Sequence, residues 1–393
     1  MLAEIDNEPQ EPAEVTYLAD VEQAIAAAVQ EVKGDPKSLR EAQSRSDWPR
    51  WKEAIDKEIN ALERAGTWET VPRPKDKNVV GCKWVCRTKY KADGSIEKYK
   101  ARVVARGFSQ VYGVDCLETY SPVAKLTSFR TILALAARFD WEIQCFDFNA
   151  AYLNGELEES EEIYMEQPPG YEEGGKDFVK KLKKALYGFK QAGRRWYDTF
   201  SREFADLGFR ARAADPGVFY ARIKDKLLIL AGHVDDCAMT GSSGKLITTY
   251  KSKLNDKFAL TDLGDISWLL GIKVTRDRAA RTISLSQSSY IDTSLSCFPL
   301  SDAKAYPTPM VPSAFYSKHD APSSPSDVAR MRKVPYREAI GSPMYAAVAT
   351  RPDIAFSVSV LSRFLENPGE AHWEAVKRIF RYLAGTRDHA LTY

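Results

Sequence analysis

The chain has 393 residues, of which 44% are hydrophobic and 28% are charged, and its formal net charge is only +2. This composition is typical of a folded protein with an ample apolar core, and the length predicts two or three structural units. No run approaches the ~20 apolar residues that a membrane span needs, the N-terminus is acidic where an import signal would be basic, and the six cysteines lack the CxxC spacing of zinc sites.

The N-terminal segment is strongly acidic. Residues 1–31 contain eight acidic residues and no Lys or Arg, so residues 1–46 are predicted to be a mobile, solvated tail. Without a secretory signal, a cytosolic or nuclear location is expected. Apolar residues spaced three and four apart from Trp48 to Ala65 then predict an amphipathic helix, which Gly66 ends.

Residues 79–106 read as two strand-like runs joined by an Asp93-Gly94 turn. From Gly81 to Arg106 there are eight bases and two acids, so 8 − 2 = +6, and aromatic residues lie between the bases. Such a hairpin suits a polyanion with stackable bases. A charged edge hairpin that lysines keep soluble would show the same pattern.

The middle of the chain alternates helical and strand-like patterns. Residues 126–138 have a helical period, and residues 143–146 predict a short buried strand with Asp147 at its end. A second basic segment, residues 178–195, contains seven bases and no acid. A further helix is predicted over residues 196–207.

Residues 227–240 read LLILAGHVDDCAMT and predict a hairpin of two buried strands with Asp235 and Asp236 at its tip. A buried pair of carboxylates usually indicates protonation, a basic partner or a divalent cation, whereas an exposed Asp-Asp turn needs no function. Asp147 lies 235 − 147 = 88 positions earlier, so these acids can meet only through the tertiary fold. Three carboxylates and two basic segments are the parts that nucleotidyl transfer with two divalent cations needs.

Beyond the hairpin, residues 245–258 predict an amphipathic helix and residues 268–274 a strand. Residues 303–335 are rich in Pro and Ser and are predicted to be a linker. Residues 336–383 have mostly helical periodicity, interrupted at Pro352 and Pro368.

Several long blocks resemble, in the same order, the reverse transcriptase of Ty1/copia-type LTR retrotransposons. Together they cover nearly everything from Trp48 to Thr386. The most informative blocks are KARVVARGFSQVYGVDCLETYS (100–121), DFNAAYLNG (147–155), KALYGFKQAGRRWY (184–197), HVDD (233–236), LLGIKV (269–274) and ATRPDIAFSVSVLSRF (349–364).

The resemblance implies an α+β fold, a right-hand polymerase with fingers, an antiparallel palm sheet carrying helices on one face, and a largely helical thumb or connection region. An RNase H domain is expected to be absent from the chain. The expected boundaries are fingers at 47–125 and 166–195, palm at 126–165 and 196–275, and thumb or connection at 276–393.

The resemblance also implies roles for individual residues. Asp147 would be the first palm carboxylate, and Asp235 and Asp236 the hairpin pair, so that the three acids hold two Mg²⁺ ions, with Mn²⁺ as an alternative. Tyr152 would lie beneath the sugar and exclude a 2′-hydroxyl; the alternative is a core aromatic. Gln191 would contact nucleotide and template; the alternative is a helix-surface glutamine.

Other candidates would bind the triphosphate or the nucleic acid. A shift of one residue in strand register exchanges the two faces of a strand, so the sequence does not decide which basic side chain reaches the triphosphate. Two positions depart from the family pattern: His233 stands where Tyr is commoner, and Gly193 where Pro is usual, which could loosen the turn between fingers and palm. The triphosphate candidates are Lys100, Arg102 and Arg106, and the nucleic-acid candidates are Lys83, Trp84, Lys89, His233 and the primer-grip-like pair Leu270 and Gly271.

The resulting hypothesis is an RNA-directed DNA polymerase that uses dNTPs on a primed RNA or DNA template. It would act with other Pol products such as RNase H and integrase, in a cytoplasmic virus-like particle or in the nucleus, and not at a membrane. A silent retrotransposon remnant that only binds nucleic acid is the second hypothesis. A carboxylate-dependent nuclease is the third.

Overall fold

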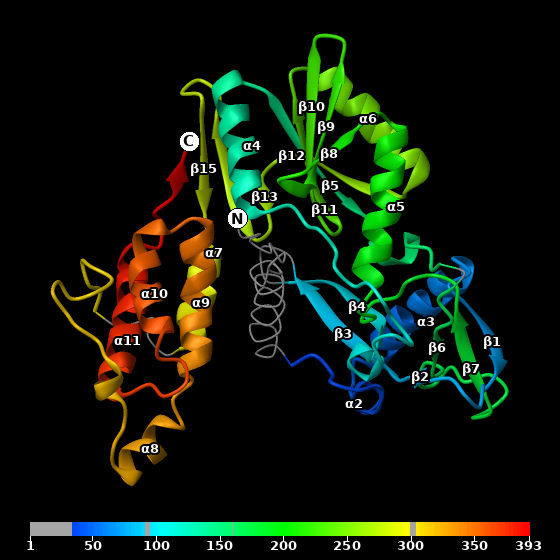
Figure 1. Cartoon of the computed structure of the whole chain (residues 1–393), viewed down its shortest axis with the longest axis horizontal. Helices are drawn as coiled ribbons and strands as arrows, with labels where there is room; N and C mark the ends of the chain where they lie inside the picture. The colour runs from blue at the N-terminus through cyan, green and yellow to red at the C-terminus, as the bar shows by residue number, and fades with distance from the viewer. Residues whose placement is uncertain (1–33, 91–94, 159, 299–303) are drawn as a thin grey trace, which may run out of the picture. The chain divides into compact units, whose positions relative to one another are not determined.

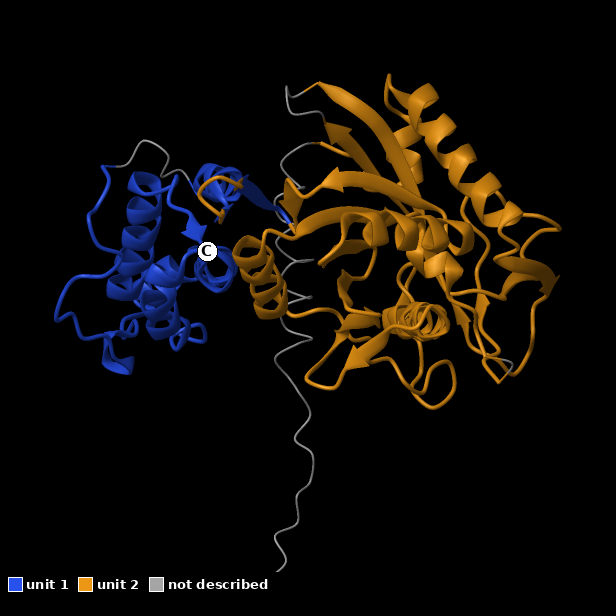
Figure 2. Cartoon of the chain, turned by 90° about the horizontal axis from the view of Figure 1, so that it is seen from above, with its two compact units in different colours: residues 1–33, 271–276, 283–393 blue, residues 34–270, 277–282 orange. Residues whose placement is uncertain are grey.

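The computed structural model of the chain describes residues 34–90, 95–158, 160–298 and 304–393 (Figure 1). These residues form two compact units (Figure 2). The larger unit contains residues 34–270 and 277–282, and the smaller unit contains residues 271–276 and 283–393. Most of the predicted acidic tail, residues 1–33, and the Asp93-Gly94 turn lie outside the described residues.

The larger unit begins with residues that were predicted to belong to the tail. Residues 34–46 include helix α2 (Leu39–Gln43), whose N-cap Ser38 accepts a hydrogen bond from the Glu41 N–H. Asp35 accepts hydrogen bonds from the backbone N–H and the hydroxyl of Thr88, at 3.0 and 2.6 Å. This part of the acidic segment is therefore folded against the body of the unit.

The predicted amphipathic helix is confirmed as α3 (Trp48–Arg64), which buries Trp51, Ile55, Ile59 and Leu62 on one side. It packs against the antiparallel hairpin of β3 (Cys82–Tyr90) and β4 (Ile96–Ala105). Beside this hairpin, a four-stranded sheet has the order β1-β7-β6-β2. Its strands are β1 (Trp68–Pro72), β7 (Phe178–Leu182), β6 (Tyr164–Met165) and β2 (Val79–Val80).

A six-stranded antiparallel sheet forms the other half of the larger unit, in the order β12-β5-β11-β10-β9-β8. Helices α5 (Ala192–Asp206) and α6 (Gly244–Lys257) bury an aromatic core against one face of the sheet. Helix α4 (Leu126–Phe139) lies against part of the other face. The strands are β5 (Glu142–Phe148), β8 (Arg210–Arg212), β9 (Asp215–Ile223), β10 (Lys226–His233), β11 (Asp236–Gly241) and β12 (Leu260–Asp265).

The predicted α+β class and the antiparallel sheet are thus confirmed. Helices on one face were expected from the resemblance, and α5 and α6 fulfil that expectation. Helix α4 is an addition on the opposite face, where its buried residues Phe129, Ile132 and Leu133 cover apolar side chains of the sheet.

The smaller unit is largely helical, as predicted. Its core contains Val358, Leu361, Val376, Ile379 and Phe380. The helices break near Pro352 and Pro368, as their sequence pattern indicated. Its strands are β14 (Ile272–Asp277), β15 (Thr282–Ser286) and β16 (Leu391–Thr392), and its helices are α7 (Ser288–Cys297), α8 (Pro325–Met331), α9 (Tyr336–Ala349), α10 (Ala355–Ser362) and α11 (Glu370–Gly385). Strands β14 and β15 extend by one residue each into residues 277–282, which belong to the larger unit.

The predicted linker contains regular structure in the part that is described. A short 3-10 helix, η4 (Lys318–Asp320), and helix α8 lie within residues 304–335. Ser317 and Ser324 cap these two helices with their side chains. Among the described residues, no helix combines the length and the apolar character that crossing a membrane requires.

Candidate active site

A two-residue turn joins β10 to β11, because His233 and Asp236 are partners in the antiparallel register. Val234, the first turn residue, has φ 61°. A β-branched residue rarely adopts a positive φ, and such strain costs about 1–3 kcal/mol. The Trp196 indole N–H of α5 donates a hydrogen bond of 2.7 Å to the Val234 carbonyl oxygen. The hydrogen bond from Trp196 of α5 therefore holds the strained turn in place.

The structure brings the three sequence-predicted acids to one place on the sheet. Asp236 of β11 pairs in register with Asp147 of β5. The Phe148 N–H donates a hydrogen bond of 3.0 Å to the Asp235 carbonyl oxygen. Phe146 and Phe148 point into the core beneath α5 and α6, so Asp147, which lies between them on the strand, points to the opposite face.

The electrostatics of Asp147 depend on groups from several segments. Burial raises the pKa of the Asp147 carboxyl, and the charge of Asp235 raises it further. Lys100 and Arg102 act in the opposite direction and lower the pKa of Asp147. The carboxylates and the basic side chains of β4 are therefore near enough to interact.

The carboxylates are chemically suited to a divalent cation. The charge of Asp235 disfavours the ionisation of Asp147, and a bound cation would relieve that repulsion. Within the described ranges, no cluster of three or more His, Cys, Asp or Glu side chains is arranged to hold a metal ion. The site thus offers a pair of mutually repelling acids rather than a closed cage, which suits Mg²⁺ because this ion keeps several waters and takes substrate phosphates as ligands.

One face of the β3–β4 hairpin is basic and the other is buried. The buried face belongs to the apolar core and includes Cys82, Trp84 and Cys86 from β3 and Ala101 and Val103 from β4. Residues that alternate with these, and their cross-strand partners, share the opposite face. We call this face the basic face; its charged members are Lys83, Arg87, Lys89, Lys98, Lys100 and Arg102.

Like charges lie directly opposite each other on the basic face. Arg87 is the register partner of Lys100, and Lys89 is the partner of Lys98. Such pairs destabilise a hairpin. Burial and the neighbouring charges of Arg102, Lys89 and Lys98 lower the pKa of Lys100. A polyanionic ligand would remove this repulsion.

The register also separates the three triphosphate candidates. Lys100 and Arg102 share the basic face and both act on the pKa of Asp147. Arg106 follows the end of β4, where its side chain packs beside Gly81: a Cβ at that glycine would lie 3.3 Å from the Arg106 Cδ. Of the three candidates, Lys100 and Arg102 therefore act on the Asp147 carboxylate, and Arg106 packs beside Gly81.

Tyr152 lies in the short 3-10 helix η3 (Ala151–Asn154), immediately after β5. Its pKa is raised by burial and by Asp235 and is lowered by Arg102, so its hydroxyl is within the field of the site. Its ring packs edge-on against Tyr187, with 5.0 Å between ring centroids.

Tyr187 and Glu58 were missed by the sequence reasoning. The guanidinium carbon of Arg102 lies 4.1 Å from the centroid of the Tyr187 ring. Burial raises the pKa of Tyr187 to about 12. Burial also raises the pKa of the Glu58 carboxyl, against the effect of Arg102 and Lys100. Tyr187 lies in the block KALYGFKQAGRRWY (184–197), which could have identified it, whereas Glu58 carries no such signal. The tertiary fold brings α3 and the segment after β7 to β4.

Several other predicted site residues have different surroundings. Trp84 is only 4% exposed, and its indole N–H donates a hydrogen bond of 2.9 Å to the Pro169 carbonyl oxygen. Lys83 and Lys89 are exposed. Half-buried His233 faces Asp236 across the hairpin. Leu270 and Gly271 have positive φ values of 50° and 72° at the junction of the two units. Their contacts with nucleic acid stay predictions.

Gln191 is fully buried at the N-terminus of α5. Its side-chain amide donates a hydrogen bond of 2.9 Å to the Asp115 carbonyl oxygen and accepts one of 3.0 Å from Gln110. The side chain is thus neither on the helix surface nor open to a ligand, and its role toward nucleotide or template stays a prediction. Gly193 lies in the first turn of α5, where a Cβ would be 3.0 Å from the Ser121 Cβ.

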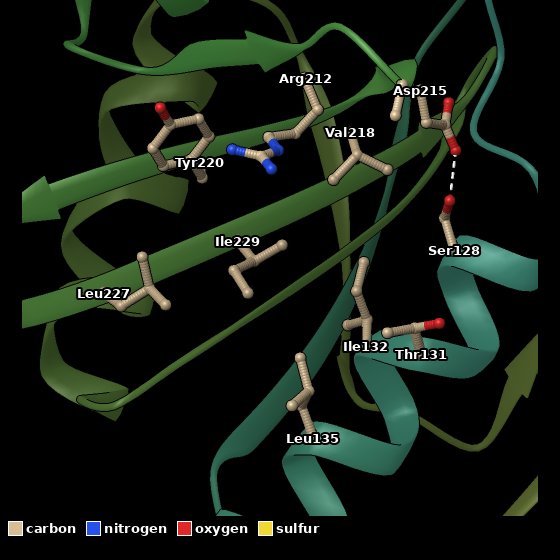
Figure 3. A pocket seen from close by; sticks show the side chains of 11 residues that line it. Ser128, Thr131, Ile132, Leu135, Arg212, Asp215, Val218, Tyr220, Leu227 and Ile229 are labelled. Carbon is tan, nitrogen blue, oxygen red and sulfur yellow. Dashed lines mark hydrogen bonds between the residues drawn. The ribbon is translucent and has the colours of Figure 1, made fainter.

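A separate cavity of about 420 Å³ lies between α4 and strands β9 and β10 (Figure 3). Ile132, Leu135 and Ile229 contribute to its mostly apolar walls. The Asp215 carboxylate at its edge accepts hydrogen bonds from the Ser128 hydroxyl and the Lys125 N–H. Because this carboxylate is already hydrogen-bonded, the cavity offers little for phosphoryl chemistry.

Residues 65–312 match the family described as reverse transcriptase (RNA-dependent DNA polymerase). The chain is 44% identical over 361 residues to a retrovirus-related Pol polyprotein from transposon TNT 1-94 of Nicotiana tabacum, which covers 91% of this chain and 27% of that protein. It is 38% identical over 346 residues to the corresponding polyprotein from transposon RE1 of Arabidopsis thaliana, covering 87% and 23%.

Two further matches differ in coverage. A putative transposon Ty5-1 protein of Saccharomyces cerevisiae is 31% identical over 248 residues, covering 63% of this chain and 78% of that protein. A foamy viral protease-reverse transcriptase solved with double-stranded DNA matches with a TM-score of 0.42 and 11% identity, covering 86% of this chain and 48% of that one. The chain spans about a quarter of the length of the Pol polyproteins that it matches.

Proposed function

Because the chain belongs to the reverse transcriptase family, we propose that it extends the 3′-end of a primer with deoxynucleotides on an RNA or DNA template. The observation that carries this proposal is the convergence of Asp147 with the Asp235-Asp236 turn, where the charges of Lys100 and Arg102 also act on the pKa of Asp147. Acids for divalent cations and bases for a triphosphate are the two halves of a nucleotidyl-transfer site.

In the proposed reaction, the acidic side chains hold the cations and the basic side chains bind the triphosphate. Asp147 and Asp235, with Asp236 beside them, would hold divalent cations, Mg²⁺ or alternatively Mn²⁺, which activate the primer hydroxyl and neutralise the leaving pyrophosphate. Lys100 and Arg102 would bind the triphosphate oxygens. In the described part of the chain, neither of these two side chains makes an ion pair or a hydrogen bond, so their donors are available.

Tyr152 would select the sugar. Its ring is fixed from the side by Tyr187 and lies close enough to Asp235 and Arg102 for both to affect its pKa. A rigid aromatic ring at this point leaves little room for a 2′-hydroxyl on the incoming nucleotide. The exposed bases of the basic face, such as Lys83 and Lys89, would contact phosphates of the template.

The test is extension of a DNA primer on an RNA template in the presence of Mg²⁺, with three proteins compared. Wild type should extend the primer, and Asp235→Asn should reduce extension by at least about 100-fold. The matched control is Asp225→Asn, because Asp225 is an exposed aspartate in the turn at the other end of β10. This control should extend like wild type.

Other functions give other results in the same assay. A silent remnant would bind the primer–template duplex and extend it no better than Asp235→Asn. A carboxylate-dependent nuclease would shorten the primer. Either result would overturn the polymerase proposal.

We also propose that the chain works beside other products of a Pol polyprotein, such as an RNase H and an integrase. The support is that two of the relatives are named Pol polyproteins and are between three and four times as long as this chain. A cytoplasmic particle and the nucleus both suit such a protein. Fractionation of cells that express the full polyprotein would test this, since the chain should co-sediment with the nucleic acid that it copies.

A further inference from the structure

Three segments that are far apart in the sequence meet at the ring of Tyr187. Arg102 comes from β4, Tyr152 from η3, and Tyr187 from the segment between β7 and α5. The Arg102 guanidinium carbon lies 4.1 Å from the Tyr187 ring centroid. The Tyr152 ring meets Tyr187 edge-on, with centroids 5.0 Å apart and an interplanar angle of 73°. One ring therefore contacts both proposed nucleotide-binding side chains.

The backbone holds this ring in place. The Ala105 N–H donates a hydrogen bond of 2.8 Å to the Tyr187 carbonyl oxygen. Gly188 has φ 90°, and a Cβ there would lie 2.2 Å from the Ala105 carbonyl oxygen. On the other side, a Cβ at Gly107 would lie 2.1 Å from the Gly188 carbonyl oxygen. The two segments touch backbone to backbone, so the backbone of Tyr187 cannot move away from β4 without opening this contact.

Arg102 depends on Tyr187 for its orientation. No hydrogen bond or ion pair holds its side chain within the described residues, although Glu58 acts on it at longer range. A guanidinium that stacks on an aromatic face keeps the N–H groups along its edge free for a planar, bidentate contact with phosphate. The ring thus restricts the guanidinium without using its donors.

We propose that Tyr187 is a positioning residue that couples triphosphate binding by Arg102 to sugar selection by Tyr152. The inference rests on the proposed polymerase function. If Arg102 and Tyr152 acted independently, a change at Arg102 would not affect the choice of sugar. With coupling through Tyr187, a change on the triphosphate side of the pocket alters discrimination between deoxynucleotides and ribonucleotides. Tyr187 itself does not touch the reacting atoms.

The experiment compares steady-state nucleotide incorporation by Tyr187→Leu and Tyr187→Phe. Leu removes the ring, so Arg102 is no longer held in one orientation before the triphosphate binds, and the KM for dNTP should rise roughly ten-fold. The kcat should stay within about two-fold of wild type because the carboxylates are untouched. Selectivity for dNTP over rNTP should fall. Phe keeps the ring, so this variant should behave like wild type.

The matched control is Tyr250→Leu. Tyr250 is also a largely buried tyrosine of the larger unit, with the Lys253 ammonium 4.7 Å from its ring centroid and Phe209 edge-on at 5.4 Å. It lies on α6, outside the proposed site. Its loss should lower stability without changing KM or sugar selectivity. If Tyr187→Leu changes KM and selectivity no more than Tyr250→Leu, the coupling role is wrong.

A second variant keeps the inference testable if Tyr187→Leu does not fold. Arg102→Lys keeps the charge but loses the planar stack. Coupling through Tyr187 predicts that Arg102→Lys also lowers dNTP-over-rNTP selectivity, and unchanged selectivity would overturn the inference. Extension by wild type but not by Asp235→Asn establishes the polymerase separately, so the two proposals fail by different results.

Discussion

Asp147 on β5 and Asp236 on β11 are register partners in the antiparallel sheet, although 236 − 147 = 89 positions separate them in the chain. The residue whose charge raises the pKa of Asp147, however, is Asp235 in the adjoining turn. The strand pairing therefore aligns the two segments, and the turn supplies a carboxylate whose charge acts on Asp147. This division of roles leads to the first prediction.

Asp147→Asn should raise stability at pH 7 in the absence of divalent cations. The folded-state pKa of Asp147 lies above its ordinary value of 3.8. The stability that its protonated form contributes is therefore complete below the unfolded-state pKa and is lost as the pH rises through the folded-state pKa. At pH 7 the ionised carboxylate destabilises wild type, and Asn removes that penalty. Thermal melts in EDTA should show the difference at pH 7 and its disappearance below about pH 4.

Mg²⁺ should reverse this order. At ten times its dissociation constant, a ligand that binds only the folded state stabilises it by about 1.4 kcal/mol, which raises the melting temperature by about 3–6 °C for a unit of this size. Wild type should show this shift and Asp147→Asn should not. An equal shift in both proteins would place the cation elsewhere.

Local patterns predicted much of the site. The apolar runs around residues 143–146 and 227–240 identified the strands and placed Asp147, Asp235 and Asp236 at their ends, because strand periodicity depends on neighbouring residues alone. The basic character of the β3–β4 hairpin was also predictable from composition. The way these segments meet was expected only through the resemblance.

The side-chain environments could not be predicted in the same way. Trp84 alternates with Lys83 on β3, and only the packing of α3 decides that the tryptophan face is buried. Gln191 precedes a helix, but its burial depends on hydrogen bonds with Gln110 and Asp115, about 80 residues earlier. Tyr187 acquires its neighbours through the backbone contact with Ala105.

Tyr152→Ala should increase ribonucleotide incorporation. The half-buried ring lies beside Tyr187, and its removal leaves space next to the sugar. A site that excludes one hydroxyl by shape discriminates by roughly 10–100-fold, so most of that factor should be lost. Parallel measurement of kcat/KM for dNTP and rNTP checks this. If discrimination between dNTP and rNTP does not change, Tyr152 is only a core aromatic residue.

Lys89→Ala should weaken nucleic-acid binding while slightly stabilising the fold. Lys89 is exposed and faces Lys98 across the hairpin, so its removal relieves a repulsion of about 0.2–1 kcal/mol. Loss of one phosphate contact should reduce the salt dependence of binding, log K against log salt, by about one unit. Lys226→Ala, at an exposed lysine of β10, is the control and should leave that slope unchanged. A reduced slope in both variants would mean that the basic face has no specific role in nucleic-acid binding.

Gly107→Ala should destabilise the larger unit strongly. The new Cβ would lie 2.1 Å from the Gly188 carbonyl oxygen, which belongs to backbone and cannot rotate away. Overpacking of this kind costs about 1–3 kcal/mol, and denaturant unfolding should show it. Gly341→Ala is the contrasting change, because nothing lies within 4 Å of a Cβ there and the residue is inside α9. That variant should gain about 0.5–1 kcal/mol.

Trp196→Phe should reduce catalysis through the strained turn beside Asp235. Phe retains the aromatic packing against Phe148 and Phe200 but cannot donate the 2.7 Å hydrogen bond to the Val234 carbonyl oxygen. Freed from this contact, Val234 can leave its positive φ and displace Asp235. The kcat should fall about ten-fold or more with little change in the KM for dNTP, since Lys100 and Arg102 lie on another segment.

The control for this variant is Trp84→Phe, which removes a similar part-buried hydrogen bond of 2.9 Å to the Pro169 carbonyl oxygen. Both variants should lose about 0.5–1.5 kcal/mol of stability, because each loses one part-buried hydrogen bond to a backbone carbonyl. Only Trp196→Phe should lose kcat, since Trp84 faces the core on the side of β3 away from the basic face. Equal losses of kcat in the two variants would mean that general stability, and not the geometry of the Val234-Asp235 turn, limits the reaction.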